Sequence, residues 1–272
     1  MSLGPIRTAK VGCPYPPKAQ MKTKLFLLLF FSCSTVVLRA DQDSFAAIRT
    51  ALDQNQLEAA ETALAPLVAI EKPDGRAWFY LSQLRSRQKR TNEAIQPAEN
   101  AVTADPDRAE YQSNLGRILG QRAGEVSFMQ RAFLAHPMLA AFKKSVALDP
   151  EHIPGYVGLS QYYTYAPAIA GGGRETAERY AHELEKRDPV LGTTELANIA
   201  EHFNDPVQAY ALYTKASVAQ SNAAWIQEAL GRLSEKLHQP AEAKAHYEKA
   251  IAIEPARTSV QEALTRLASV NR

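Results

Sequence analysis

The chain has 272 residues but only two cysteines, Cys13 and Cys33, and both lie within the segment 1–40. From residue 41 onward no disulfide and no thiol chemistry is possible, so the fold must be stabilised by packing alone. The apolar run within residues 21–40 is shorter than the ~20 apolar residues that a transmembrane helix needs. No stretch alternates polar and apolar residues over a useful length, which argues against a β-sheet.

Motifs of the common enzyme classes are also missing. The six histidines are scattered, and none has a second histidine three or four residues away, so His182-Glu183 lacks the partner of a zinc-protease helix. There is no Gly-x-Ser-x-Gly elbow and no acid pair with an evident partner. We therefore expect a protein that is not an enzyme, with no catalytic residues, no metal and no cofactor.

The segment 1–40 has no acidic residue and carries six basic ones: Arg7, Lys10, Lys18, Lys22, Lys24 and Arg39. Within it, 21-MKTKLFLLLFFSCSTVVLRA-40 has the basic start, apolar core and small final residue of a secretory signal peptide. We expect residues 1–20 to be an upstream extension that results from a wrongly assigned start codon. Residues 21–40 are expected to be removed when the protein is exported to the periplasm or secreted. A second route stays open, because 30-FFSC-33 resembles a bacterial lipobox with Cys33 as the lipidated residue. Membrane attachment is expected only by that route.

Removal of residues 1–40 changes the charge of the protein. Without their six basic residues, 25 Lys and Arg stand against 29 Asp and Glu, a net charge of −4. The basic isoelectric point of the whole chain therefore belongs to the precursor. An acidic chain has no electrostatic reason to bind nucleic acid, and no nucleic-acid partner is expected.

The region from Asp41 onward repeats itself, most clearly in 224-AWIQEALGRLSEKLHQPAEAKAHYEKAIAIEP-255. In this unit an L-G pair precedes small, aromatic and proline positions: Leu230-Gly231, Ala243, Tyr247, Ala250 and Pro255. The spacing from Ala60 to Ala94 equals the spacing from Ala209 to Ala243. Each unit also has two stretches with apolar residues at three- and four-residue spacing, which is typical of amphipathic helices. The pattern resembles the tetratricopeptide repeat, a helix–turn–helix unit of about 34 residues, which is also the spacing of these alanines.

The resemblance covers the chain from residue 41 and implies an all-α fold, a right-handed superhelix of about six repeats. The units are expected at 41–74, 75–108, 109–152, 153–189, 190–223 and 224–257. A single helix pair cannot bury its apolar face, so neighbouring units must stack on one another. Residues 258–272 are then expected to form a helix that caps the open end of the stack.

Unit four is lengthened by 166-APAIAGGGRETAERYA-181, whose three glycines resemble a phosphate-binding loop. A nucleotide loop needs a strand before it and Gly-Lys-Ser/Thr or spaced glycines, whereas here a helix precedes and Arg174-Glu175 follows. We interpret the stretch as an enlarged turn between two helices, similar to one in secreted bacterial tetratricopeptide-repeat proteins. The start of the second helix, with Arg174, stays open as a weak anion site.

Unit three is also lengthened, within 120-GQRAGEVSFMQRAFLAHP-137, where apolar residues at helical spacing predict an extra or longer helix. We expect its apolar side to be core rather than pocket. Because the loops between paired helices lie on one edge of a stack, the insertions of units three and four should touch. The predicted insertion surface consists of Phe128, Phe133, Tyr162, Tyr165, Ile169 and Arg174.

The resemblance further implies a concave face that binds a peptide or a partner protein. Positions two, five, nine and twelve of the first helix in each unit select Arg76, Phe79, Gln83, Arg117, Gln161, Asn198, Glu228 and Arg232. The three arginines among them are candidates for binding carboxylates through two parallel hydrogen bonds. The alternative function is binding of a small molecule or lipid in a pocket made by the two insertions. The sequence names neither the partner nor the oligomeric state.

Overall fold

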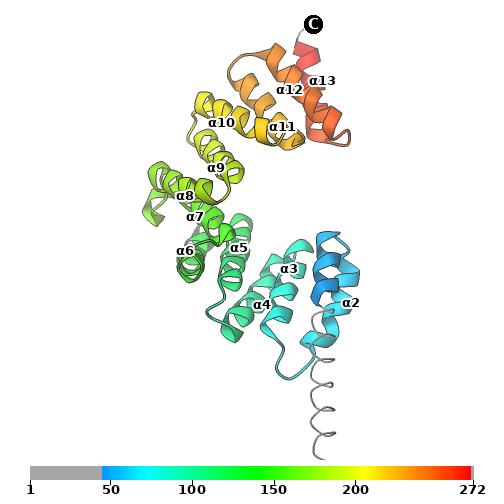
Figure 1. Ribbon diagram of the computed structural model, residues 1–272, viewed down its shortest axis with the longest axis vertical. Coiled ribbons are helices and arrows are strands. Elements are labelled where there is room, and N and C mark those ends of the chain that lie inside the picture. Colours follow the sequence, from blue (N-terminus) through cyan, green and yellow to red (C-terminus); the bar gives the residue numbers. More distant parts are fainter. Residues whose placement is uncertain (1–44, 271–272) are drawn as a thin grey trace, which may run out of the picture. The chain divides into compact units, whose positions relative to one another are not determined.

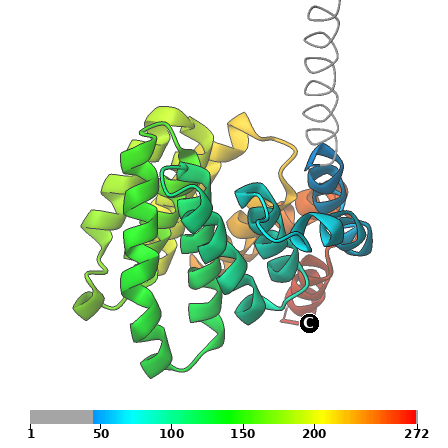
Figure 2. The same ribbon diagram turned by 90° about the horizontal axis from the view of Figure 1, so that it is seen from below.

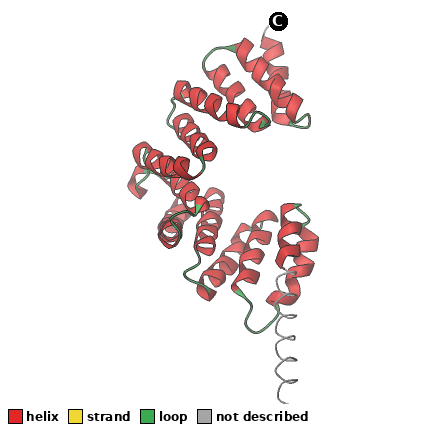
Figure 3. Ribbon diagram, in the orientation of Figure 1, coloured by secondary structure: helices red, strands yellow, loops and turns green. Residues whose placement is uncertain are grey.

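The computed structural model describes residues 45–270, and this part of the chain is made of helices and the turns between them (Figure 3). The chain divides into two compact units, Met1–Ala47 and Ile48–Arg272. Of the first unit only residues 45–47 are described, and they are helical. The predicted signal peptide and Cys33 lie outside the described residues.

In the second unit, helices follow one another as packed pairs (Figure 1). Helical residues 48–53 precede α2 (Leu57–Val68), and the next two pairs are α3 (Gly75–Arg87) with α4 (Thr91–Ala104) and α5 (Ala109–Glu125) with α6 (Phe128–Leu148). The fourth pair is α7 (Ile153–Tyr165) with α8 (Arg174–Arg187), and a 3₁₀ turn, η1 (Ala168–Ala170), stands between them. Then come α9 (Pro189–His202) with α10 (Pro206–Ala219), α11 (Ala224–Lys236) with α12 (Pro240–Ile253), and finally α13 (Thr258–Val270). The predicted all-α repeat fold is confirmed.

The regular pairs share one turn geometry. Asn55, Lys89, Asn204 and His238 each have a positive φ of 56° to 60° and stand where the first helix of a pair ends. A residue with left-handed backbone at this place allows the amide of the following residue to donate a hydrogen bond to a carbonyl in the last turn of the helix. The Arg90 amide donates in this way to the Arg85 carbonyl at 2.9 Å. Units three and four lack a non-glycine residue of this kind, so their turns differ from the others.

Both helices of unit three are long. The helix α5 has 17 residues and α6 has 21, and Figure 2 shows them as neighbouring long helices. The lengthened helix predicted for residues 120–137 is present and runs through Pro137. The expectation that its apolar side is core was wrong near its start: Phe128 is 64% exposed and Phe133 is 79% exposed. They lie in the first turns of α6, beyond the part of that helix whose side chains are covered.

The glycine-rich stretch of unit four is a compact turn against α7. Gly171 has a φ of 85°, and a Cβ on Gly172 would lie 1.7 Å from the carbonyl oxygen of Ala166. The amide of Gly173 donates to the carbonyl of Tyr163 at 2.8 Å, after which α8 begins at Arg174. Gly171 and Gly172 are therefore required, because the first has a left-handed backbone and at the second the chain returns closely on itself. One detail differs from expectation: Pro189 begins α9 instead of closing the unit before it.

Candidate functional site

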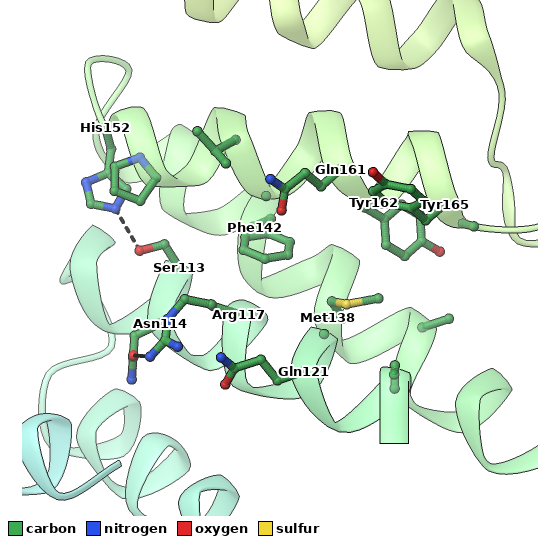
Figure 4. Close-up of a pocket in the computed structure, with 18 of the residues that line it drawn as sticks. Ser113, Asn114, Arg117, Gln121, Met138, Phe142, His152, Gln161, Tyr162 and Tyr165 are labelled. Atoms are coloured by element: carbon green, nitrogen blue, oxygen red, sulfur yellow. Dashed lines mark hydrogen bonds between the residues drawn. The ribbon is translucent and has the colours of Figure 1, made fainter. Parts of the chain in front are cut away.

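A groove of about 1000 Å³ lies along the first helices of units two to five. Its residues come from α3, α5, α7 and the start of α9, together with α6 and the segment 166–170. Arg117 and Gln121 of α5 lie on one side, Gln161 and Tyr165 of α7 on the other, and Phe142 of α6 lies between them (Figure 4). Most of the lining is apolar, with a few polar groups spaced along it, which is the composition of a binding site.

The floor of the groove depends on Phe142, which is 5% exposed. Its ring packs against two glycines on neighbouring helices: a Cβ on Gly116 would lie 2.7 Å from the ring, and one on Gly158 only 2.1 Å. Because both positions lack a side chain, α5 and α7 approach the same ring from two sides. The second helix of unit three thus supplies the apolar base on which two first helices are placed.

Arg117 is one of two arginines that line the groove. Its Nη2 donates to Oδ1 of Asn114 at 2.8 Å, and its Nη1 to the hydroxyl of Ser86 at 3.4 Å. Within residues 45–270 it has no carboxylate at ion-pair distance, although its side chain is accessible from the groove. The surrounding protein reduces its hydration and lowers the pKa of Arg117, and Arg87 adds repulsion. An arginine with donors to spare and no acid partner is poised to receive an anion.

The groove also contains a neutral histidine. The Nε2 atom of His152 lies 2.7 Å from the Ser113 hydroxyl, which in turn donates to the carbonyl of Glu110. Burial lowers the pKa of His152 below its usual value, so the ring is uncharged at neutral pH. It supplies shape and one hydrogen bond rather than charge.

A buried carboxylate stands beside the groove on α9. Glu195 is 6% exposed, and its Oε1 accepts from Nε2 of Gln161 at 3.3 Å and from Nδ2 of Asn198 at 3.5 Å. Burial raises the pKa of Glu195, since both partners are neutral amides. Asn198 also accepts a hydrogen bond from the Tyr213 hydroxyl at 2.5 Å. Asn198 therefore forms hydrogen bonds to Glu195 and Tyr213, and it does not line the groove.

Of the predicted concave residues, Phe79, Gln83, Arg117 and Gln161 line the groove. Arg76 instead pairs with Asp74, which caps α3, at 2.6 Å. Arg232 pairs with Glu201 at 3.1 Å, and Glu228 pairs with Arg257 at 2.5 Å. The pair of Arg232 with Glu201 joins units five and six, and the pair of Glu228 with Arg257 joins α11 to the turn before α13. Arg117 is thus the predicted arginine that faces the groove without an acid.

The predicted insertion surface divides in the same way. Tyr162 and Tyr165 line the groove, although Tyr162 is buried and its hydroxyl donates to the carbonyl of Ala170 at 3.0 Å. Phe128, Phe133 and Ile169 do not line it, and Ile169 is 95% exposed. Arg174 contacts Glu178 at 2.8 Å and Asp205 at 3.2 Å, so the weak anion site proposed there is filled by the chain's own acids. Of the predicted insertion surface, only Tyr162 and Tyr165 line the groove, and the insertions contribute further lining residues that were not predicted.

Sequence reasoning missed groove residues on α5, α6 and α7. Met138 and Phe142 line the groove although they belong to a second helix, and Asn114 and His152 contribute polar atoms. Phe142 lies on the stretch after Pro137, where helical spacing of apolar residues continues, and that was the available signal. Between residues 45 and 270 no three His, Cys, Asp or Glu side chains are arranged to hold a metal ion. Nor is any helix of this part of the chain long and apolar enough to cross a bilayer.

Comparison with known proteins supports the repeat. A model of the tetratricopeptide repeat matches residues 226–257. No curated protein matches the chain in sequence. Solved structures that are similar over most of it include PilW, TTC0263 and PilF. PilW, a widely conserved type IV pilus biogenesis factor, is 17% identical, with 83% of this chain and 98% of PilW covered and a TM-score of 0.65.

The other two structures are TTC0263, a thermophilic tetratricopeptide-repeat protein of Thermus thermophilus, and PilF of Pseudomonas aeruginosa. TTC0263 is 22% identical. The match covers 72% of this chain and 97% of TTC0263, with a TM-score of 0.56. PilF is 16% identical. The match covers 72% of this chain and 83% of PilF, with a TM-score of 0.54. At these identities the likeness shows the fold alone.

The chain thus contains a tetratricopeptide repeat and has the superhelical fold of tetratricopeptide-repeat proteins, built of helix pairs packed in sequence. Proteins of this class are typically non-catalytic scaffolds, and they generally bind protein partners.

Proposed function

We propose that this protein is an exported scaffold that binds a segment of a partner protein in the groove along α3, α5 and α7. The observation that carries the proposal is the groove itself, about 1000 Å³ in volume and lined by first helices of successive units. Its amide side chains, Gln83, Gln121 and Gln161, can both donate to and accept from a peptide backbone. The apolar lining supplies the burial that gives affinity.

A photo-cross-linking residue placed at Gln161, which lines the groove, should capture the partner in the native cells. The matched control is the same residue at Lys244 of α12, which is 64% exposed and does not line the groove. We expect specific cross-linked products from position 161 and none of them from position 244. Mass spectrometry then identifies the captured protein.

The purified partner is next tested in solution by hydrogen exchange. Binding in the groove should slow amide exchange in α5 and α7 and leave α12 unchanged, because the ligand limits local opening of the helices it touches. Identical products from both cross-linking positions, or protection restricted to the outer helices, would show that the groove is not the binding site.

Export is proposed from residues 21–40, which combine a basic start, an apolar core and a small final residue. Fractionation of native cells followed by N-terminal sequencing should find the protein outside the cytoplasm, beginning near Asp41. Cytosolic protein that begins at Met1 or Met21 would contradict export. Palmitate labelling that disappears in Cys33→Ala would replace this route with lipidation.

A further inference from the structure

Residues of both insertions line one part of the groove. This chamber is the part of the groove lined by Gly120, Gly124, Ala135, Met138, Tyr162 and Ala166. Four of these six residues are glycine or alanine, and a Cβ on Gly124 would meet no atom within 4 Å. The space beside Gly124 is therefore free for an atom group from outside. Met138, whose sulfur would lie 3.2 Å from a Cβ on Gly120, and Tyr162 add an apolar and an aromatic side chain to the lining.

Two arginines line the groove near the chamber, Arg117 from α5 and Arg131 from the start of α6. Nε of Arg131 donates to the carbonyl of Ala123 on α5 at 2.8 Å. Residues 117 and 123 are six positions apart on one helix, which corresponds to about 9 Å along its axis. Like Arg117, Arg131 has no carboxylate at ion-pair distance within residues 45–270.

The acids near the chamber do not neutralise these two charges. Among the residues that the structure describes, Glu110 is the one carboxylate that lines the groove, and its Oε2 lies 3.8 Å from Nε of Arg108. From residue 41 onward the protein carries four more acidic than basic residues, so a cationic groove stands out against the charge of the chain. Complementary charge of this kind selects partners and fixes their orientation.

We propose that the chamber binds a bulky apolar side chain of a partner peptide, while carboxylates on either side of that residue pair with Arg117 and Arg131. This inference rests on the proposed function, because it names the chemistry of the segment that the groove receives. A peptide fits better than a fatty acid, which has one carboxylate for two arginines. An acyl chain would also place apolar atoms against the amide of Gln83, which has no hydrogen-bond partner among residues 45–270.

A random dodecapeptide display library, selected on residues 41–272, tests the proposal without knowledge of the natural partner. We expect enriched peptides to combine an aromatic residue or leucine with Asp or Glu on both sides. A fluorescein-labelled peptide of the enriched sequence is then titrated by fluorescence anisotropy. Arg117→Gln and Arg131→Gln should each weaken binding about tenfold, because each removes a charge-assisted contact.

The contribution of the open space in the chamber and the contribution of the arginine charges are tested with separate variants and controls. Gly124→Leu should weaken binding by about tenfold or more by occupying the chamber, whereas Gly124→Ala adds one methyl group and should have a small effect. Arg232→Gln should bind as the wild type does, because Arg232 pairs with Glu201 and does not line the groove. Circular dichroism verifies that each variant is folded, and Arg131 and Gly124 have exposed side-chain positions where substitution disturbs little packing.

The outcomes separate this inference from the proposed function. If enriched peptides bind the Arg117, Arg131 and Gly124 variants as tightly as the wild type, the inference is wrong and the scaffold function stands. Enrichment of peptides without acidic residues would likewise contradict the inference and leave the scaffold function unaffected. If no peptide is enriched and no partner is captured from position 161, both fail. Displacement of the labelled peptide by cis-parinaric acid, with tighter binding of that lipid, would assign the chamber to a fatty acid instead.

Discussion

Replacement of Gly192 by alanine is expected to destabilise the protein strongly, because the added methyl group meets the backbone of the neighbouring helix. A Cβ at this position would lie 2.3 Å from both the backbone nitrogen and the Cα of Glu185. A side chain in the way could rotate, but here the obstacle is the backbone of α8. The helices α8 and α9 must then move apart, although they are joined through the single residue Asp188.

Asp188 adds to the cost because it also holds the start of α9. Its carboxylate accepts from the amides of Val190 at 3.1 Å and Leu191 at 2.9 Å, so a shift of α9 strains this cap. Overpacking typically costs about 1–3 kcal/mol and occasionally more, and we expect about 3 kcal/mol or more here. That corresponds to a fall of roughly 6–12 °C in melting temperature, measured by circular dichroism.

The matched control is Gly124→Ala, also a glycine inside a helix. With no atom within 4 Å of its new Cβ, it should raise stability by about 0.5–1 kcal/mol, the usual gain when alanine replaces glycine in a helix. The two substitutions add the same methyl group and should shift melting in opposite directions. A Gly192→Ala variant that melts as the wild type does would contradict the close approach of α8 and α9.

Deletion of residues 258–272 is the second large effect that we expect. The helix α13 contributes Val260 and Ala263 to a buried cluster with Ala243, Tyr247 and Ala250 of α12. Tyr247 is 1% exposed in the whole protein and loses this cover in the deletion. Each large apolar side chain that is fully uncovered costs roughly 1.5–3 kcal/mol.

Polar contacts are lost with the same helix. Glu235 pairs with Arg266 at 2.8 Å, and Glu228 accepts from the Ser259 hydroxyl at 2.8 Å. We therefore expect early melting of the last pair by circular dichroism and concentration-dependent association by light scattering, because an open repeat end exposes an apolar face. The control is Glu262→Ala, an exposed position on α13 that should change neither property. A deletion variant that stays monomeric with unchanged melting would show that α13 does not act as a cap.

Sequence reasoning predicted the helices well because they depend on local spacing. Alanines one repeat apart marked positions where two helices approach, and Ala60, Ala94, Ala209 and Ala243 are all fully buried. The glycine-rich stretch was interpreted as a turn because no strand precedes it, and α7 does precede it. Such signals depend on contacts within a few residues, which the linear sequence contains.

The groove was predicted less well because it depends on neighbours about one repeat away. Arg117 and Arg232 occupy equivalent first-helix positions, yet Glu201 of the preceding unit neutralises Arg232, whereas the described residues provide no acid for Arg117. Likewise Phe128 and Met138 are both apolar residues of α6, but only Met138 reaches the chamber. A pattern along one helix cannot distinguish such residues.

The sequence by itself determined that the part of the chain described by the structure is built of helix pairs without disulfides, because apolar spacing, small residues and turn residues all act locally. The tertiary structure decided which arginines face an acid and which insertion residues meet. The physical reason is that charge neutralisation and the volume of the chamber arise between units, where the stacking of one pair on the next sets every distance.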